Sequence, residues 1–239
     1  MSPEEEIKAK AVEFAKKNKT QIANELTDIS RFASDDHPIS VFMAGSPGAG
    51  KTEFSKELIG ILEEDGQRKV VRIDGDELRQ RMPGYVGNNS DLFQGAISIV
   101  VEKIHDCVLE KMQTFILDGT FAKYDKATHN IRRSLNKHRS VFIFYVYQTP
   151  GTAWRVTQAR ERLEGRNIPK PAFIEQFCGA KETVERLHHE FTDRVVIFLV
   201  KKDFNTSATK EVVKIVDPNT SIDLSIGEHY TKEELEKSL

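Results

Sequence analysis

The apolar and polar positions along the chain fall into two kinds of run. Stretches with apolar residues at three- and four-residue steps are typical of helices with one buried face, and short unbroken apolar runs are typical of strands covered on both faces of a parallel sheet. Runs of the second kind occur at 39–44, 70–73, 115–117, 141–146 and 195–199. Helical spacing fills the intervals between them. The pattern therefore predicts an α/β fold of three layers, in which helices cover both faces of a five-stranded, mainly parallel sheet with right-handed crossovers.

The helices are predicted at 3–34, from the end of the glycine-rich segment at 45–52 to about 65, and at 90–112, 125–138, 151–164 and 171–191. The tail is expected to form a hairpin over 211–226, turning at Asp217-Pro218-Asn219, and Thr231 with Glu234 has the capping-box spacing that starts a terminal helix. We expect a single domain over 1–239, made of a helical preface (1–38), a core (39–200) and the tail (201–239).

Composition narrows the possible partners. The chain has 239 residues and a formal net charge of -2, so its balance of acidic and basic residues does not favour binding to nucleic acid or to an anionic membrane. The two cysteines, Cys107 and Cys178, lack metal-ligand spacing and are expected to be core residues in a reducing compartment. The acidic start and the lack of a long apolar run predict a soluble, cytoplasmic protein.

The segment between the first predicted strand and the next helix has the form GxxxxGK[ST], which is a strong signal in that context. Glycines allow the backbone N–H groups to turn inward around phosphate oxygens, and the helix adds the positive end of its dipole. Lys51 is expected to bridge the β- and γ-phosphates of a nucleoside triphosphate, taken as ATP, and the Thr52 hydroxyl to coordinate Mg²⁺. The expected ATP-binding residues are Gly45, Ser46, Pro47, Gly48, Ala49, Gly50, Lys51, Thr52 and the adjacent Glu53.

Carboxylates follow the second and third predicted strands, at the sheet edge where ligands bind in open α/β folds. Asp118 is the expected Walker-B-type residue, which orders Mg²⁺ directly or through water. Asp76 is the candidate general base toward a hydroxyl acceptor, and Asp74 competes for that role. Helix capping is the alternative for both, more so for Asp74. Asp76 and Asp118 are also expected to contact the substrate, and Thr120 is expected either to bind substrate or to cap the next segment.

Residues 155–169 contain several arginines before a glycine break. Charge develops on a phosphoryl group in transfer, and arginines on a mobile lid neutralise it while excluding water. We expect Arg160 and Arg166 to serve this purpose, with Arg162 in reserve. A solvated helix face is the alternative.

Taken together, the chain resembles the zeta toxin family of P-loop kinases, which phosphorylate the 3′-hydroxyl of the amino sugar in UDP-N-acetylglucosamine. The resemblance spans roughly residues 5–200 and rests on the ordered set Gly45 to Thr52, Ile73-Asp74-Gly75-Asp76, Asp118-Gly119-Thr120, and Arg160 with Arg166 ahead of Pro169. It implies a P-loop kinase fold, Asp76 as the base, Lys51 and both arginines on the phosphates, and Thr120 at the substrate. It also implies a nucleotide-sugar substrate and an antitoxin protein as a partner.

The resemblance is weakest on the acceptor side, where Phe121-Ala122-Lys123 replaces an expected arginine and the segment between the two lid arginines is short. Other functions therefore stay open: a P-loop kinase of another small hydroxyl compound, such as a nucleoside, a dinucleotide or an antibiotic, or an NTP-binding switch that is not a kinase.

Overall fold

A computed structural model describes residues 2–64, 66, 68–203, 208–217 and 221–239. Within these residues, six strands form one sheet in the order β2-β3-β1-β4-β5-β6. The first five are parallel and β6 pairs antiparallel with β5. The strands are β1 (Ile39–Ala44), β2 (Val71–Asp74), β3 (Phe115–Asp118), β4 (Ser140–Tyr147), β5 (Val195–Lys202) and β6 (Thr209–Ile215). The predicted α/β class and the five parallel strands are confirmed, and the sheet has one strand more than expected.

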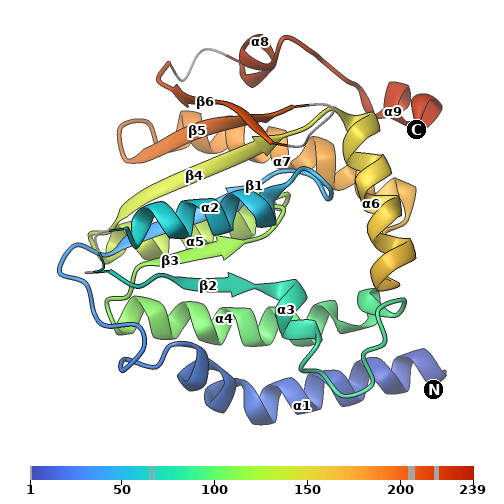
Figure 1. Ribbon diagram of the computed structural model, residues 1–239. Helices are drawn as coiled ribbons and strands as arrows, with labels where there is room; N and C mark the ends of the chain where they lie inside the picture. The colour runs from blue at the N-terminus through green and yellow to red at the C-terminus, as the bar shows by residue number, and fades with distance from the viewer. Residues whose placement is uncertain (1, 65, 67, 204–207, 218–220) are drawn as a thin grey trace.

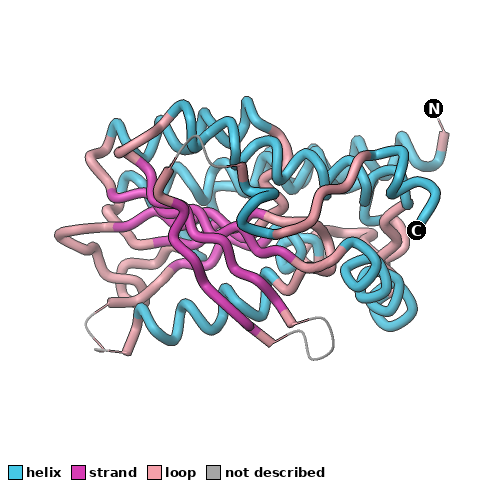
Figure 2. The backbone as a smooth tube through the Cα atoms, turned by 90° about the horizontal axis from the view of Figure 1, so that it is seen from above, coloured by secondary structure: helices cyan, strands magenta, loops and turns pink. Residues whose placement is uncertain are grey.

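Helices cover both faces of the sheet, as Figure 2 shows from above. Side chains alternate along the strands, so that Val41 and Met43 of β1 pack under α2 while Phe42 and Ala44 face the other layer. This second layer contains α4, α5 and α7, and α1 packs along the outside of α4. The main helices are α1 (Pro3–Leu26), α2 (Lys51–Leu62), α4 (Gln94–Glu110), α5 (Tyr124–Asn136), α6 (Pro150–Glu164) and α7 (Lys170–Glu190).

Two short helical elements lie between β2 and α4, namely α3 (Gly75–Arg79) and the 3-10 helix η1 (Ser90–Phe93). Figure 1 shows α6 standing at the carboxyl edge of the parallel strands, with α3 at the same edge. The two helices therefore flank the place where the ends of β1 and β3 meet. This edge is where the sequence places the ligand.

The first helix is shorter than predicted. The apolar spacing that continues to residue 33 suggested a helix over 3–34, but α1 ends at Leu26. Asp28 accepts hydrogen bonds from the Ser30 backbone N–H and hydroxyl, a local turn that competes with helical bonds. Ile29, which carried part of the periodic pattern, is 54% exposed.

The tail also differs from the prediction. The hairpin expected over 211–226 does not form, because residues up to Ile215 belong to β6, which pairs with β5, and Ile222–Ile226 form the short helix α8. Of the predicted turn, Pro218 and Asn219 lie outside the described residues. The terminal helix is confirmed as α9 (Lys232–Ser238), with the predicted capping box between Thr231 and Glu234. Within the described part of the chain, no helix has both the length and the apolar character needed to cross a membrane.

Candidate active site

The glycine-rich loop lies between β1 and α2 and is tightly enclosed. Gly45, Gly48 and Gly50 have φ values of +136°, +72° and +89°, in the region that favours glycine. A Cβ atom added to Gly45 would lie 2.3 Å from the Val146 carbonyl oxygen, and one added to Gly48 would lie 2.1 Å from that of Ala153. The loop therefore packs directly against the end of β4 and against α6, and only glycine fits at these two positions.

Lys51 projects back over this loop from the first turn of α2. Its Nζ donates hydrogen bonds to the carbonyl oxygens of Gly45 and Ser46, at 3.0 and 2.6 Å. Burial lowers the pKa of Lys51 to about 8, with Asp118 and Asp76 acting in the opposite direction and Arg166 and Arg160 adding to the decrease. Asp76, Arg160 and Arg166 thus all lie within electrostatic range of this ammonium group, which remains mostly charged at neutral pH.

Asp118 ends β3 and lies in register beside Asp74, which ends β2. The side chain of Asp118 is 5% exposed, and its Oδ2 accepts hydrogen bonds from Arg72 Nη2 at 2.7 Å and from the Ser55 hydroxyl at 3.0 Å. Arg72 is also ion-paired with Asp74 and with Glu77. Burial and the nearby Asp118 raise the pKa of Asp74, whereas Arg72 opposes that change. One buried arginine therefore bridges the two strand-end carboxylates.

Asp74 and Asp76 have different environments. Asp74 is the N-cap of α3, where its Oδ1 accepts the Asp76 backbone N–H at 2.7 Å. The Asp76 side chain is 46% exposed and is ion-paired through one oxygen with Arg79 and through the other with Arg166. Arg79 is held in turn by Gln94 at 2.8 Å. The capping role expected for Asp74 is thus the one it occupies, and Asp76 is the carboxylate that a substrate could reach.

The arginine segment reaches both sides of the site. Arg160, within α6, is ion-paired with Glu53 on the first turn of α2 at 2.6 Å, and Arg166, just after α6, is ion-paired with Asp76. Arg162 is exposed. The structure therefore brings Arg160 to the phosphate loop and Arg166 to the candidate base, and it does not bring Arg162 to either.

Thr120 is joined to the phosphate loop by its backbone, since its carbonyl oxygen accepts the Gly45 N–H at 3.1 Å. It does not cap the next helix, because the N-cap of α5 is Lys123. Phe121 follows with φ of +59°, and its ring stacks on Phe42 at a centroid separation of 5.4 Å. The first residue of the segment that replaces the expected arginine thus packs against the core.

The side-chain oxygen atoms near the loop are of the kind that coordinates Mg²⁺ bound together with a nucleotide. The Thr52 hydroxyl and the Asp118 carboxylate are hard oxygen ligands, and Mg²⁺ typically takes one or two such groups from a protein with phosphate and water completing the shell. Among the described residues there is no group of three or more His, Cys, Asp and Glu side chains arranged to hold a metal ion. We therefore assign Thr52 and Asp118 as the candidate protein ligands.

Sequence reasoning missed three residues of this site: Arg72, Ser55 and Arg79. A signal was present for Arg72, a charged residue within the apolar run Val70-Val71-Arg72-Ile73. Arg79 follows Asp76 by three residues, a spacing that lets the two side chains meet on one helix face. Ser55 gives no such signal, since its role depends on how α2 packs against β3.

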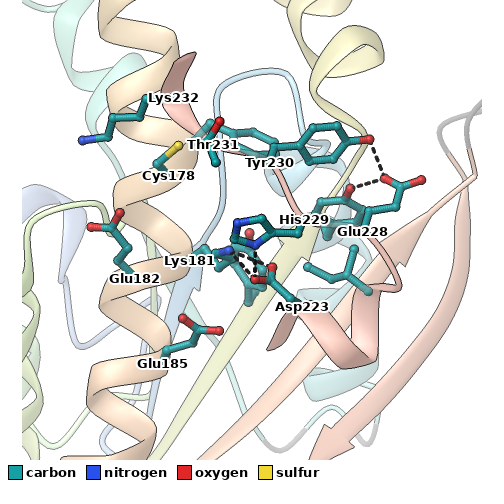
Figure 3. A pocket seen from close by; sticks show the side chains of 14 residues that line it. Cys178, Lys181, Glu182, Glu185, Asp223, Glu228, His229, Tyr230, Thr231 and Lys232 are labelled. Atoms are coloured by element: carbon teal, nitrogen blue, oxygen red, sulfur yellow. Dashed lines mark hydrogen bonds and ion pairs between the residues drawn. The ribbon is translucent and has the colours of Figure 1, made fainter. Parts of the chain in front are cut away.

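A separate cavity of about 350 Å³ lies between α7, the end of β4 and the C-terminal segment, as Figure 3 shows. Its polar side chains bind one another. Asp223 pairs with Lys181 at 2.7 Å and with His229 at 2.6 Å, and Glu228 accepts hydrogen bonds from the hydroxyls of Tyr147 and Tyr230 at 2.7 and 2.8 Å. None of the residues that line it belongs to the phosphate loop. These contacts hold the C-terminal segment against the core.

Comparison with protein families gives one match over most of the chain: the model of the zeta toxin family matches residues 23–215. Among curated proteins, the chain is 32% identical over 63 residues to the mitochondrial disaggregase of Homo sapiens and 30% identical over 63 residues to that of Rattus norvegicus. This similarity is local, because it covers 23% of this chain and the chain spans only 9% of the length of those relatives.

Solved structures with a similar fold include one from the PezAT chromosomal toxin-antitoxin system of Streptococcus pneumoniae. It has a TM-score of 0.66 and 20% identity, over 93% of this chain and 91% of that one. The AvrRxo1-ORF1:-ORF2 complex with ATP has a TM-score of 0.56 and 12% identity, over 90% of this chain and 67% of that one. At these identities the similarity concerns the fold.

Proposed function

This chain belongs to the zeta toxin family, and from that premise we propose that it is a kinase that transfers the γ-phosphoryl group of ATP to a hydroxyl group of a nucleotide sugar. The 3′-hydroxyl of UDP-N-acetylglucosamine is the leading acceptor. The observation that carries the proposal is the position of Asp76, a half-exposed carboxylate held between Arg79 and Arg166 within electrostatic range of Lys51.

The residues of the loop bind the triphosphate in this proposal. Backbone N–H groups from 45–52 and the first turn of α2 receive the phosphate oxygens, and Lys51 moves from the loop carbonyls to the β- and γ-phosphates. Arg160 exchanges Glu53 for the phosphoryl group, because that pair is partly exposed and a guanidinium can bind a phosphate through two parallel hydrogen bonds. Mg²⁺ held by Thr52 and Asp118 would neutralise the charge on the phosphates.

Asp76 accepts the proton of the acceptor hydroxyl. Phosphoryl transfer proceeds through a loose transition state, in which positioning the attacking hydroxyl contributes most to catalysis. Arg79 and Arg166 hold the Asp76 carboxylate in place, and this carboxylate orients the hydroxyl. Arg166 is also placed to balance the charge of the transferred phosphoryl group. Asp74 is a poorer candidate, because its carboxylate is 10% exposed and is bound to Arg72 and to the first turn of α3.

The comparisons support two further parts of the proposal. A solved structure of similar fold is of a complex with ATP, which favours ATP as the donor. Another belongs to a toxin-antitoxin system, which favours an antitoxin protein as a partner of this chain. Expression of the chain in a bacterial host tests the toxin reading: the wild type is expected to arrest growth and Lys51→Ala is not. Equal growth of both would contradict it.

The acceptor is tested by incubating the purified protein with ATP, Mg²⁺ and a panel of nucleotide sugars, nucleosides and dinucleotides, and by reading product masses. We expect a mass gain of about 80 Da, one phosphoryl group, on UDP-N-acetylglucosamine. Lys51→Ala serves as the matched control and should give no product. A mass gain confined to nucleosides or dinucleotides would show that the acceptor is not a nucleotide sugar. ATP hydrolysis with no phosphorylated acceptor would favour a nucleotide-dependent switch.

A further inference from the structure

Arg72 stands where a strand of this sheet would ordinarily carry an apolar residue. It lies between the buried residues Val71 and Ile73 of β2, and it is in register with Ile116, which packs under α2. Its side chain is only 10% exposed. Burying a guanidinium group costs several kcal/mol unless it is paired and hydrogen-bonded, so the position is not explained by packing.

The contacts of Arg72 connect the two candidate metal ligands. Its Nη2 lies 2.7 Å from Asp118 Oδ2 and is also paired with Asp74, and its Nε donates to the Ser55 hydroxyl at 3.2 Å. The same hydroxyl lies 3.0 Å from Asp118 Oδ2 and 3.0 Å from the carbonyl oxygen of Thr52. Arg72 and Ser55 thus form a bridge from the end of β3 to the first turn of α2.

This bridge uses one oxygen of the Asp118 carboxylate. Both described hydrogen bonds to that carboxylate end on Oδ2, and Oδ1 has no hydrogen-bond partner among the described residues. A carboxylate fixed through one oxygen presents the other in a single direction. Groups that orient a metal ligand in this way typically change metal affinity by about 10- to 100-fold when they are removed.

We propose that Arg72 is a positioning residue for the metal site: it fixes Asp118 through Oδ2 so that Oδ1 is presented to Mg²⁺ or its bound water. The inference rests on the proposed use of ATP with Mg²⁺ at the phosphate loop. Arg72 acts through Asp118 and touches neither the nucleotide nor the acceptor. Its loss should therefore weaken metal binding and raise the Mg²⁺ concentration needed for half-maximal turnover.

The test measures Mn²⁺ binding by electron paramagnetic resonance, on the full chain with a non-hydrolysable ATP analogue. Arg72→Gln is expected to bind Mn²⁺ about 10- to 100-fold more weakly than the wild type and to need correspondingly more Mg²⁺ for half-maximal turnover. Arg72→Lys keeps the charge without the planar fork, so it should remain several-fold weaker than the wild type. Full recovery in Arg72→Lys would overturn the positioning role, since charge alone would then suffice.

Arg133→Gln is the matched control, because Arg133 is a 19% exposed arginine paired with Glu102 and Asp106, neither of which belongs to the site. It should leave Mn²⁺ affinity unchanged. An unchanged affinity in Arg72→Gln, an equal loss in Arg133→Gln, or a wild type that binds no Mn²⁺ would each overturn the inference. If Arg72→Gln does not fold, Ser55→Ala replaces it. This variant is expected to bind Mn²⁺ more weakly than the wild type, by a smaller factor, and an unchanged Mn²⁺ affinity would contradict the inference.

The same measurements separate this inference from the proposed function. A wild-type protein that binds Mn²⁺ and the ATP analogue but phosphorylates no acceptor would defeat the kinase proposal. The Mn²⁺ affinities of the Arg72 variants would still decide whether Arg72 positions the metal ligand.

Discussion

A buried histidine, His105, should make this protein less stable in acid. His105 lies on α4 with 1% of its surface exposed, and its ring contacts Phe42 and Phe115 at centroid separations of 6.2 and 5.0 Å. Burial lowers the pKa of His105 to about 3, and the nearby guanidinium groups of Arg133 and Arg139 contribute to the decrease. The folded protein therefore keeps this imidazole almost entirely neutral at about pH 5 and above.

The magnitude follows from the difference between the folded and unfolded states. In the unfolded chain a histidine has a pKa of about 6.5, so it binds a proton there well before it does in the fold. Stability from this group is fully present above about pH 6.5 and is lost as pH falls toward about 3. A pH of about 5 is about 1.5 units below the pKa in the unfolded chain, so the free energy of unfolding falls by about 2 kcal/mol.

Urea denaturation at about pH 7.5 and about pH 5 measures this loss. His105→Gln removes the titrating group, so the variant should lose about 2 kcal/mol less than the wild type between the two pH values. His37→Gln is the control, because His37 is exposed and should leave the wild-type pH dependence intact. Equal losses in the wild type and His105→Gln would refute the reasoning.

Three further predictions concern backbone and charge. Gly48→Ala should abolish ATP binding in a fluorescent-nucleotide titration, because its Cβ would lie 2.1 Å from a carbonyl oxygen of α6, whereas Gly151→Ala, with nothing within 4 Å, should bind normally. Phe121→Gly should be about 1 kcal/mol more stable than Phe121→Ala in urea, because glycine relieves the strain of a positive φ while both variants lose the stacking on Phe42. Burial raises the pKa of Asp35, but its ion pair and hydrogen bonds outweigh this and lower it, so its stabilisation is present above about pH 4 and lost in stronger acid. Asp35→Asn should therefore be less stable than the wild type at neutral pH, and the difference should shrink in acid.

Much of the fold could be read from the sequence because its signals are local. The five parallel strands are buried on both faces, so each appears as an unbroken apolar run, and the phosphate loop needs its glycines at fixed positions. The pairing of β6 was predicted wrongly for the opposite reason, since a hairpin over 211–226 was expected and β6 pairs with β5. It is an edge strand with exposed lysine, glutamate and valine residues, and its pairing with β5 depends on the rest of the sheet.

The site shows the same division. The sequence allowed a proposal for Asp76, Arg160 and Arg166, because a phosphotransferase needs a carboxylate at the ligand-binding edge of the sheet and arginine side chains on a lid. The structure brings Asp76 and Arg166 together. Which carboxylate binds which arginine could not be read, because it depends on the register of β2 and β3. The same register places Arg72 opposite Ile116, and from there its side chain reaches Asp118. The position of Phe121 could not be predicted either, because it depends on packing against Phe42, which is far away in the sequence.

The central claim is that Asp76 directs phosphoryl transfer from ATP to an acceptor hydroxyl. The most direct measurement is single-turnover transfer of γ-labelled phosphate from ATP to UDP-N-acetylglucosamine, comparing the wild type with Asp76→Asn at matched ATP occupancy. We predict that Asp76→Asn binds ATP as the wild type does and transfers the label about 100- to 10,000-fold more slowly. Transfer at the wild-type rate by Asp76→Asn would contradict the account.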